Sequence, residues 1–203
     1  DCRWGLFPSV SLGWNVSKEP FWPSAQTDLK FRLSYGKTGN QDGISNYGWQ
    51  PLISGGANFM EQSAIAVSSK GNENLTWETA DQYDFGFDLS FLKGKVNMIF
   101  DAYLKNTNNL LYSMPMHATS GQTSMLCNIG SMRNYGVEFT LNTHVDLGPV
   151  HWSSSFNITH NKNELTKLIN DDIVALGSNH ALKVGEEIGS FHLLNFQGIY
   201  QYD

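Results

Sequence analysis

Six histidines are the residues best suited to acid–base or metal chemistry, and their spacing favours neither. None pairs with a glutamate in the H-E-x-x-H pattern that sets two imidazoles on one face of a zinc-binding helix. The tripeptide Gly36-Lys37-Thr38 ends like a phosphate-binding loop, but Phe31 occupies the position of the upstream glycine that such a loop needs. No G-x-S-x-G nucleophile elbow occurs. We therefore expect no catalytic residue, no metal ligand and no cofactor.

Four carboxylates share one face of the predicted strands, and they are Asp84, Asp88, Asp101 and Glu138. Two such groups flanking a sugar would suit a glycosidase, which is one interpretation. The other, which we favour, is a water-filled interior whose wall carries these acids with the counter-charges Arg32, Lys95 and Lys105. The four carboxylates are accordingly predicted to face a lumen.

Aromatic and amide side chains occur together in the long segments between the predicted strands. Those singled out are Trp49, Asn58, Phe59 and Tyr112. Aromatic rings stack on sugars and peptides, and amides hydrogen-bond to them, so we predict that these residues contact a ligand or a partner. The alternative is that they pack the loops together, because loops of this size need a small core of their own.

The composition indicates a chain that meets both water and an apolar medium. Charged residues make up 16% of the sequence and aromatic residues 13%, whereas soluble domains carry about 25% charged residues. The net charge of −6 argues against nucleic acid as a partner. No run of about 18 apolar residues occurs, so no transmembrane helix is expected. Cys2 and Cys127 fit no metal spacing, and we expect both to be free, although the sequence leaves their pairing open.

Period-two alternation is the strongest structural signal. Between Trp77 and Phe91, the odd positions from Tyr83 onward are apolar and the even positions are small or acidic. A strand with two such faces lies between two different solvents. Similar alternation covers residues 10–16, 29–35, 96–104, 135–145 and 152–161. The residues predicted to face lipid are Phe85, Phe87, Leu89, Phe100, Val137, Phe139, Phe156 and Ile158.

The connections between these strands alternate in length. Short or moderate connections follow Val16, Phe91 and Val145, and long connections cover residues 37–75, 106–133 and 162–189. In an up-and-down meander, all short turns then lie at one end of the sheet and all long loops at the other. Bacterial outer-membrane barrels have this asymmetry.

The predicted fold is therefore all-β, an antiparallel meander that forms a curled, partial transmembrane β-barrel of about 6–7 strands. Only residues 164–168 look helical, and residues 191–202 are expected to form a last, less regular strand. The alternative fold is a soluble, carbohydrate-binding β-sandwich, because a sandwich strand also has one apolar face.

Aromatic residues mark both ends of the apolar face. Trp14, Phe91 and Trp152 stand near the short turns, and Tyr35, Tyr83 and Tyr135 stand near the long loops. The two groups are about ten residues apart, which is the span of a tilted transmembrane strand. Tyr103 breaks this pattern because it falls on the polar face.

Five motifs follow one another along nearly the whole chain. They are residues 3–14 (RWGLFPSVSLGW), 29–41 (LKFRLSYGKTGNQ), 74–79 (NLTWET) and 128–138 (NIGSMRNYGVE), and the glycine-rich stretch 184–201. Each motif alone is weak, but in this order they resemble the barrel of SusC/RagA-type TonB-dependent outer-membrane transporters. Residues 44–66 and the dipeptide Leu126-Cys127 match no part of that pattern.

The resemblance implies a non-enzymatic protein of the cell outer membrane that imports oligosaccharides or peptides for nutrient uptake. Its implied partners are a SusD-like surface lipoprotein, the TonB complex, outer-membrane lipid and a glycan or peptide ligand. Residues 1–203 would form one partial receptor barrel, with the plug domain and the remaining strands absent from this stretch. Both ends look cut, and unpaired sheet edges are costly, so we expect that the isolated chain does not fold stably.

Overall fold

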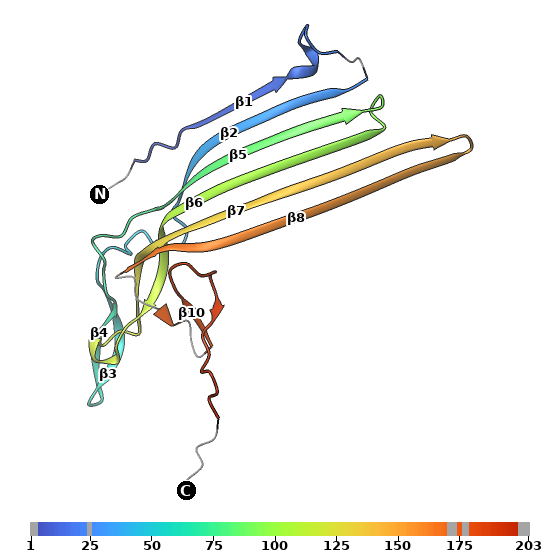
Figure 1. The fold of residues 1–203 in the computed structure, drawn as a ribbon. Coiled ribbons are helices and arrows are strands. Elements are labelled where there is room, and N and C mark those ends of the chain that lie inside the picture. The colour runs from blue at the N-terminus through green and yellow to red at the C-terminus, as the bar shows by residue number, and fades with distance from the viewer. Residues whose placement is uncertain (1–3, 24–25, 170–173, 176–178, 199–203) are drawn as a thin grey trace.

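A six-stranded antiparallel sheet dominates the computed structural model, which describes residues 4–23, 26–169, 174–175 and 179–198. Its strand order is β1-β2-β5-β6-β7-β8, so strands that follow one another in sequence lie side by side (Figure 1). These strands are β1 (Ser9–Asn15), β2 (Asp28–Asn40), β5 (Glu78–Phe91), β6 (Val96–Pro115), β7 (Ser124–Leu147) and β8 (Val150–Leu168). The predicted all-β meander is confirmed.

The register of the sheet separates apolar from polar side chains. Leu33, Phe85, Ala102 and Val137 are paired across β2, β5, β6 and β7 in one row. Arg32, Gly86, Asp101 and Glu138 form the next row. Because successive side chains of a strand point to opposite sides, these rows define an apolar face and a polar face of the sheet.

The apolar face is open. Phe85 is 43% exposed, Phe156 is 56% exposed and Ile158 is 57% exposed. The other sheets of the described part of the chain have two and three strands, and neither is a layer that could cover this face. A β-sandwich needs such a second layer. The sandwich alternative is therefore not supported.

Short turns and long excursions lie at opposite ends of the sheet (Figure 1). Residues 92–95 join β5 to β6, and residues 148–149 join β7 to β8. The first turn uses left-handed backbone at Leu92, Lys93 and Gly94, with φ between 55° and 84°. The two described helices, η1 (Val16–Lys18) and η2 (Ala118–Ser120), are single turns. No described helix is long and apolar enough to cross a membrane.

The long connection after β2 contains a separate two-stranded hairpin, β3 (Leu52–Phe59) and β4 (Gln62–Ser69), which we call the arm. Met60 and Glu61 form its turn with φ of 49° and 62°, as tight hairpin turns require. The arm interrupts the predicted loop 37–75. Its strands pair only with one another in the described residues.

The predicted long loop 106–133 is wrong, because most of it is strand. β6 continues to Pro115 and β7 begins at Ser124, and we call their outer part, residues 110–130, the loop hairpin. The pairing shifts at Asn109, which has a φ of 58°. A bulge of this kind breaks the alternation of side chains. The sequence pattern therefore appeared to end where the strand continues.

The predicted helical turn at residues 164–168 is also wrong, because β8 runs through it to Leu168. Leu165 pairs with Met132 and Lys167 with Ser131, so Thr166 is skipped. The skipped residue brings Leu165 and Leu168 to the same side, although their spacing is typical of a helix. On the partner strand, a Cβ at Gly130 would collide with the Lys167 carbonyl group.

Past β8 the chain forms a small sheet of β9 (Val174–Ala175), β10 (His180–Leu182) and β11 (Ser190–Phe191). The predicted strand 191–202 is wrong for residues 192–198, which form no strand, and residues 199–202 lie outside the described residues. β11 pairs with β10 at two positions, and the His192 N–H then donates to the Asn179 carbonyl at 2.9 Å.

A small core lies at the long-loop end of the large sheet, and we call this end, with the segments that join its strands there, the loop region. The core consists of buried residues from β7, β8 and β10, namely Cys127, Ile129, Leu165, Leu168 and Leu182. Leu165 and Leu168 are 0% and 1% exposed. Burial raises the pKa of the Cys127 thiol, because the thiolate is poorly solvated there. Cys2 lies outside the described residues.

Candidate functional site

The apolar face brings together all eight residues that the sequence predicts to face lipid. The register places Phe87 opposite Phe100, Phe100 opposite Phe139 and Phe139 opposite Ile158, across four strands. The rings of Phe87 and Phe100 stack with their centroids 5.3 Å apart. The face is therefore a continuous apolar surface rather than a set of scattered exposed residues.

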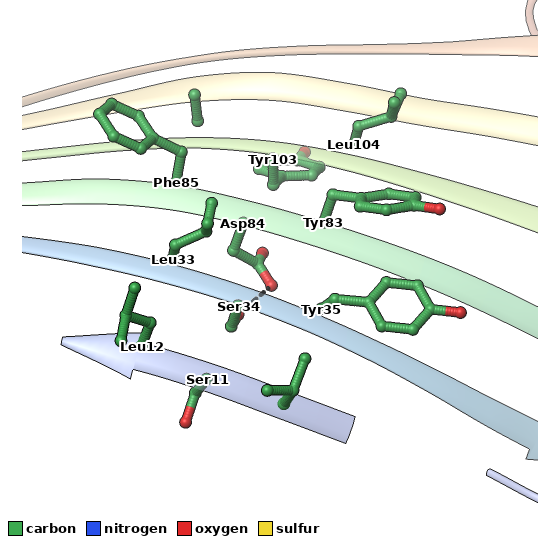
Figure 2. Close-up of a pocket in the computed structure, with 12 residues that line it drawn as sticks. Ser11, Leu12, Leu33, Ser34, Tyr35, Tyr83, Asp84, Phe85, Tyr103 and Leu104 are labelled. Atoms are coloured by element: carbon green, nitrogen blue, oxygen red, sulfur yellow. Dashed lines mark hydrogen bonds between the residues drawn. The ribbon is translucent and has the colours of Figure 1, made fainter. Parts of the chain in front are cut away.

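A row of tyrosines limits this surface on the side of the long loops. Tyr35 pairs with Tyr83, and the two ring centroids lie 5.0 Å apart. Leu104 and Tyr135 continue the row on β6 and β7. Figure 2 shows the side chains of Tyr35 and Tyr83 side by side, with both hydroxyl groups pointing the same way.

Beyond the tyrosine row the two faces exchange their character. The next positions on the formerly apolar side are polar or charged, and they are Lys37, Asp81, Asn106, Arg133 and Glu164. On the opposite side the side chains become buried, with Ala80 and Thr107 each 8% exposed and Leu165 0% exposed. The Tyr35 hydroxyl donates to Asp81 Oδ1 at 2.9 Å and so links the two zones.

The polar face carries an ion-pair cluster around Arg32. Arg32 Nη2 lies 3.0 Å from Asp88 Oδ1 and 2.9 Å from Asp101 Oδ1. Gly86 lies beneath this cluster, where a Cβ would collide with the Asp101 carboxylate and the Arg32 guanidinium. Arg32 thus provides the counter-charge that the sequence predicts for two of the carboxylates.

The other two predicted lumen residues lie on the same face. Asp84 accepts hydrogen bonds from Ser34 at 2.9 Å (Figure 2) and from Gln82 at 2.8 Å. Glu138 stands opposite Asp101 in the register. Tyr103 also points to this face, and its hydroxyl group donates to Asn161 Oδ1 at 2.8 Å. Its departure from the sequence pattern therefore has a reason, since a phenol ring needs a polar group for its hydroxyl.

A shallow hollow of about 460 Å³ lies across β1, β2, β5 and β6 (Figure 2). Its apolar lining includes Leu12, Leu33, Phe85 and Leu104. The small side chain of Ala102 leaves room between its larger neighbours. The hollow thus belongs to the apolar face and offers shape and apolar contact rather than reactive groups.

A second crevice, of about 770 Å³, lies between two stretches of the loop region. Trp49 lines it from one stretch, and Glu73, Asn74 and Trp77 line it from the other. Trp49 is 45% exposed. The crevice combines indole rings with amide groups, a combination that can stack on and hydrogen-bond to a sugar or a peptide.

The structure does not gather the four predicted loop contacts into one site. Of the three whose side chains the structure describes, only Trp49 lines the crevice. Asn58 stands on the arm opposite Ser63, whereas Tyr112 packs against the buried core. The side chain of Phe59 lies outside the described part of the chain.

Residues that were not singled out from the sequence line the crevice or hold the segment beside it. Asn74 and Trp77 line the crevice, and the Asn128 side chain bonds to Thr76 and Asn109. The signal for them was present in the motifs at 74–79 and 128–138, although composition alone gave no reason to select them. Within the described residues no group of three or more His, Cys, Asp or Glu could hold a metal ion.

Comparison with known protein families identifies the family to which this sheet and its loops belong. The family model described as "TonB dependent receptor-like, beta-barrel" matches residues 3–192. The chain belongs to the TonB-dependent receptor family. This family of transporter barrels resides in the cell outer membrane, so the chain is a piece of an outer-membrane protein.

Individual TonB-dependent receptors agree with this assignment. The chain is 33% identical to TonB-dependent receptor P3 of Formosa agariphila, with 98% of the chain and 21% of that receptor covered. It is 34% identical to TonB-dependent receptor SusC of Bacteroides thetaiotaomicron, with 93% and 19% covered. The RagAB peptide importer in its "closed-closed" state gives a TM-score of 0.82 at 29% identity, with 91% of the chain and 21% of that structure covered. The chain thus spans about a fifth of the length of these relatives.

Proposed function

We propose that this chain supplies barrel wall and extracellular loops to an outer-membrane TonB-dependent importer of oligosaccharides or peptides. The observation that carries the proposal is the sheet with one apolar and one polar face, bounded by a tyrosine row, in a chain of the TonB-dependent receptor family. An aromatic girdle of this kind marks the boundary between lipid and water in outer-membrane barrels.

In this proposal the apolar face meets lipid and the polar face meets the lumen. Phe85, Phe87 and Val137 would contact acyl chains, which would also fill the hollow beside Leu33 and Phe85. The Arg32 cluster would line the water-filled interior. Its charges are partly exposed, with side-chain exposures of 36–39%, which suits a hydrated lumen better than a dry core.

The loop region is the part proposed to meet ligand and partner. It stands on the side of the tyrosine row away from the short turns, which are periplasmic in such barrels. The crevice beside Trp49 is the candidate ligand contact. A SusD-like surface lipoprotein is the proposed partner outside the cell, and energy would come from the TonB complex through parts of the protein beyond this chain.

We further propose that the chain has no enzymatic activity. A retaining or inverting glycosidase needs two carboxyl groups that are free to exchange protons with a sugar. Here Asp88 and Asp101 are both held by Arg32, and Asp84 accepts two hydrogen bonds. These contacts favour a structural role for the carboxylates.

Uptake by cells that carry the full-length protein tests the proposal. A labelled oligosaccharide and a labelled oligopeptide are supplied separately, and we expect one of them to accumulate only when TonB is intact. Trp49→Ala should weaken binding roughly 2- to 12-fold, because one aromatic contact is worth about 0.5–1.5 kcal/mol. Tyr47→Ala is the matched control, since Tyr47 is an exposed loop aromatic outside the crevice. Uptake of neither compound, or uptake without TonB, would contradict the importer.

A further inference from the structure

The side chain of Asn128 takes the place of a missing strand partner. Its Oδ1 accepts the N–H of Thr76 at 2.9 Å, and its Nδ2 donates to the Thr76 carbonyl at 2.8 Å. The same Nδ2 donates to the carbonyl of Asn109 at 2.8 Å. A carboxamide that pairs with both backbone groups of one residue reproduces the hydrogen bonding of a neighbouring strand.

This contact lies where the ladder between β5 and β6 ends. The last pair is Thr79 with Asn108, and the next residue of β6 is the bulged Asn109. Beyond this point Glu78 Oε1 accepts the N–H of Leu111 at 2.8 Å. Side chains thus satisfy backbone groups that the interrupted ladder leaves over, as buried or half-buried backbone requires.

Two more contacts tie the same parts of the chain together. Asn72 Nδ2 donates to the Leu126 carbonyl at 3.1 Å. Near the end of the loop hairpin, Gln122 Nε2 donates to the Val67 carbonyl of the arm at 2.7 Å. The arm is therefore held at its base and again along β4, and Figure 1 shows it beside the far end of β6 and β7. Residues 73–77, which line the crevice, lie between the Asn72 contact and the start of β5, and Asn128 holds this stretch at Thr76.

We propose that Asn128 is a positioning residue, which clamps segment 72–78 and the arm to the loop hairpin so that the ligand crevice keeps its shape. The ligand role of the crevice rests on the proposed function, whereas the clamp itself rests on the three hydrogen bonds of Asn128. An isolated two-stranded hairpin is at best marginally stable in water. Without the three Asn128 bonds, the arm and residues 74–77 of the crevice would keep the single contacts of Asn72, Glu78 and Gln122 and would move more freely relative to the sheet.

The test uses Asn128→Asp in the full-length protein in detergent or vesicles. Aspartate keeps the acceptor for the Thr76 N–H, but it loses both donated bonds and sets a charged oxygen against two carbonyl groups. Asn134→Asp is the matched control, because it makes the same chemical change on the same strand without touching Thr76 or Asn109. Amide hydrogen exchange of residues 52–78 is measured for both variants, as is binding of the labelled oligosaccharide and of the labelled oligopeptide.

We expect Asn128→Asp to assemble as a barrel. Amide exchange in residues 52–78 should become about tenfold faster or more, and binding should weaken. Exchange in residues 80–91 of β5 should change little. Tenfold corresponds to about 1.4 kcal/mol. Asn134→Asp should leave the arm unchanged. Unchanged exchange in Asn128→Asp would overturn the proposal, as would equal loosening in both variants.

If Asn128→Asp does not assemble, Asn128→Ala decides the matter. This variant removes the three hydrogen bonds of the Asn128 side chain without adding a charge. Faster exchange in the arm with an intact barrel supports the clamp, and unchanged exchange contradicts it. The exchange experiment needs no ligand, so failure of the clamp remains distinguishable from failure of the importer proposal.

Discussion

The sheet has two sections that differ in how far they bury their apolar side chains. The wall section lies between the tyrosine row and the short turns, and the loop section, which is the loop region described above, lies beyond that row. In the wall section Phe156 and Ile158 remain more than half exposed, so the described part of the chain does not bury them. In the loop section Leu165 and Leu168 are fully buried by the chain itself. One continuous strand, β8, carries all four residues.

The difference between the two sections shows how one strand can expose apolar side chains in one part and bury them on the opposite side in another. Apolar side chains of β8 point away from the polar face up to Ile158. Leu165 lies on the opposite side, and the skipped residue Thr166 places Leu168 on the same side as Leu165. β6 has its own irregularity at Asn109, close to the same level of the sheet. Bulges change which side receives the next side chain. The two bulges lie just beyond the level at which the apolar side of the sheet changes, and they set the sides of the residues that follow.

The largest effect is expected in the loop section for Leu165→Ala. Removal of a fully buried leucine side chain costs about 2–5 kcal/mol. We expect faster amide exchange in residues 110–130 of the full-length protein and unchanged exchange in the wall section. Phe156→Ala is the control on the same strand and should leave exchange of the loop section unchanged. Equal loosening of the loop section by both variants would show that the two sections are one cooperative unit.

The wall section should respond instead to charge on the apolar face, which we propose meets lipid. If that face meets the membrane interior, Ile158→Arg is expected to cost about 2–4 kcal/mol. Asn157→Arg, one residue away on the polar face, should cost little. The fraction of folded barrel after refolding into lipid vesicles, read from the heat-dependent shift in gel mobility, measures both variants. Normal assembly of Ile158→Arg together with failure of Asn157→Arg would reverse the assignment of the faces.

The sequence predicted the wall section well, because its strands keep one register and therefore a strict alternation. The order of the strands and the two faces followed from that alternation, and so did the short turn after Phe91. The loop section was predicted poorly. There the bulges at Asn109 and Thr166 shift the register, so that strand residues appeared as a loop at 106–133 and as a helical turn at 164–168.

The candidate site divided along the same line. The carboxylates of the polar face could be selected because they fall at alternate positions of regular strands. Tyr112 looked like a loop aromatic but belongs to the core, since the strand that carries it was not recognised. The role of Asn128 depends on contacts with residues 19 and 52 positions away, which no local pattern reveals.

A smaller effect is expected inside the wall section for Gly86→Ala. The added methyl group would meet the Asp101 carboxylate and the Arg32 guanidinium, so the ion-pair cluster must shift. Overpacking of this kind costs about 1–3 kcal/mol. Gly13→Ala is the control in the same row, where the new Cβ would lie at an ordinary 3.7 Å from the Lys30 side chain. Urea unfolding from lipid vesicles should separate the two variants, and equal midpoints would mean that the cluster adapts freely.

The mildest test concerns the thiol of Cys127, which is 5% exposed and packed against Leu165 and Ile129. Because burial raises its pKa, a smaller fraction is thiolate at pH 8 than for an ordinary cysteine, and the reactive fraction grows only at higher pH. In a Cys2→Ser background, alkylation by iodoacetamide at pH 7 to 9 should be about tenfold slower or more than for the exposed thiol introduced by Ser124→Cys. Leu165→Ala should remove much of that protection, since it opens the same core. Rapid alkylation of Cys127 in the otherwise unaltered protein would mean that the loop section is open in water, and its contrast with the wall section would then disappear.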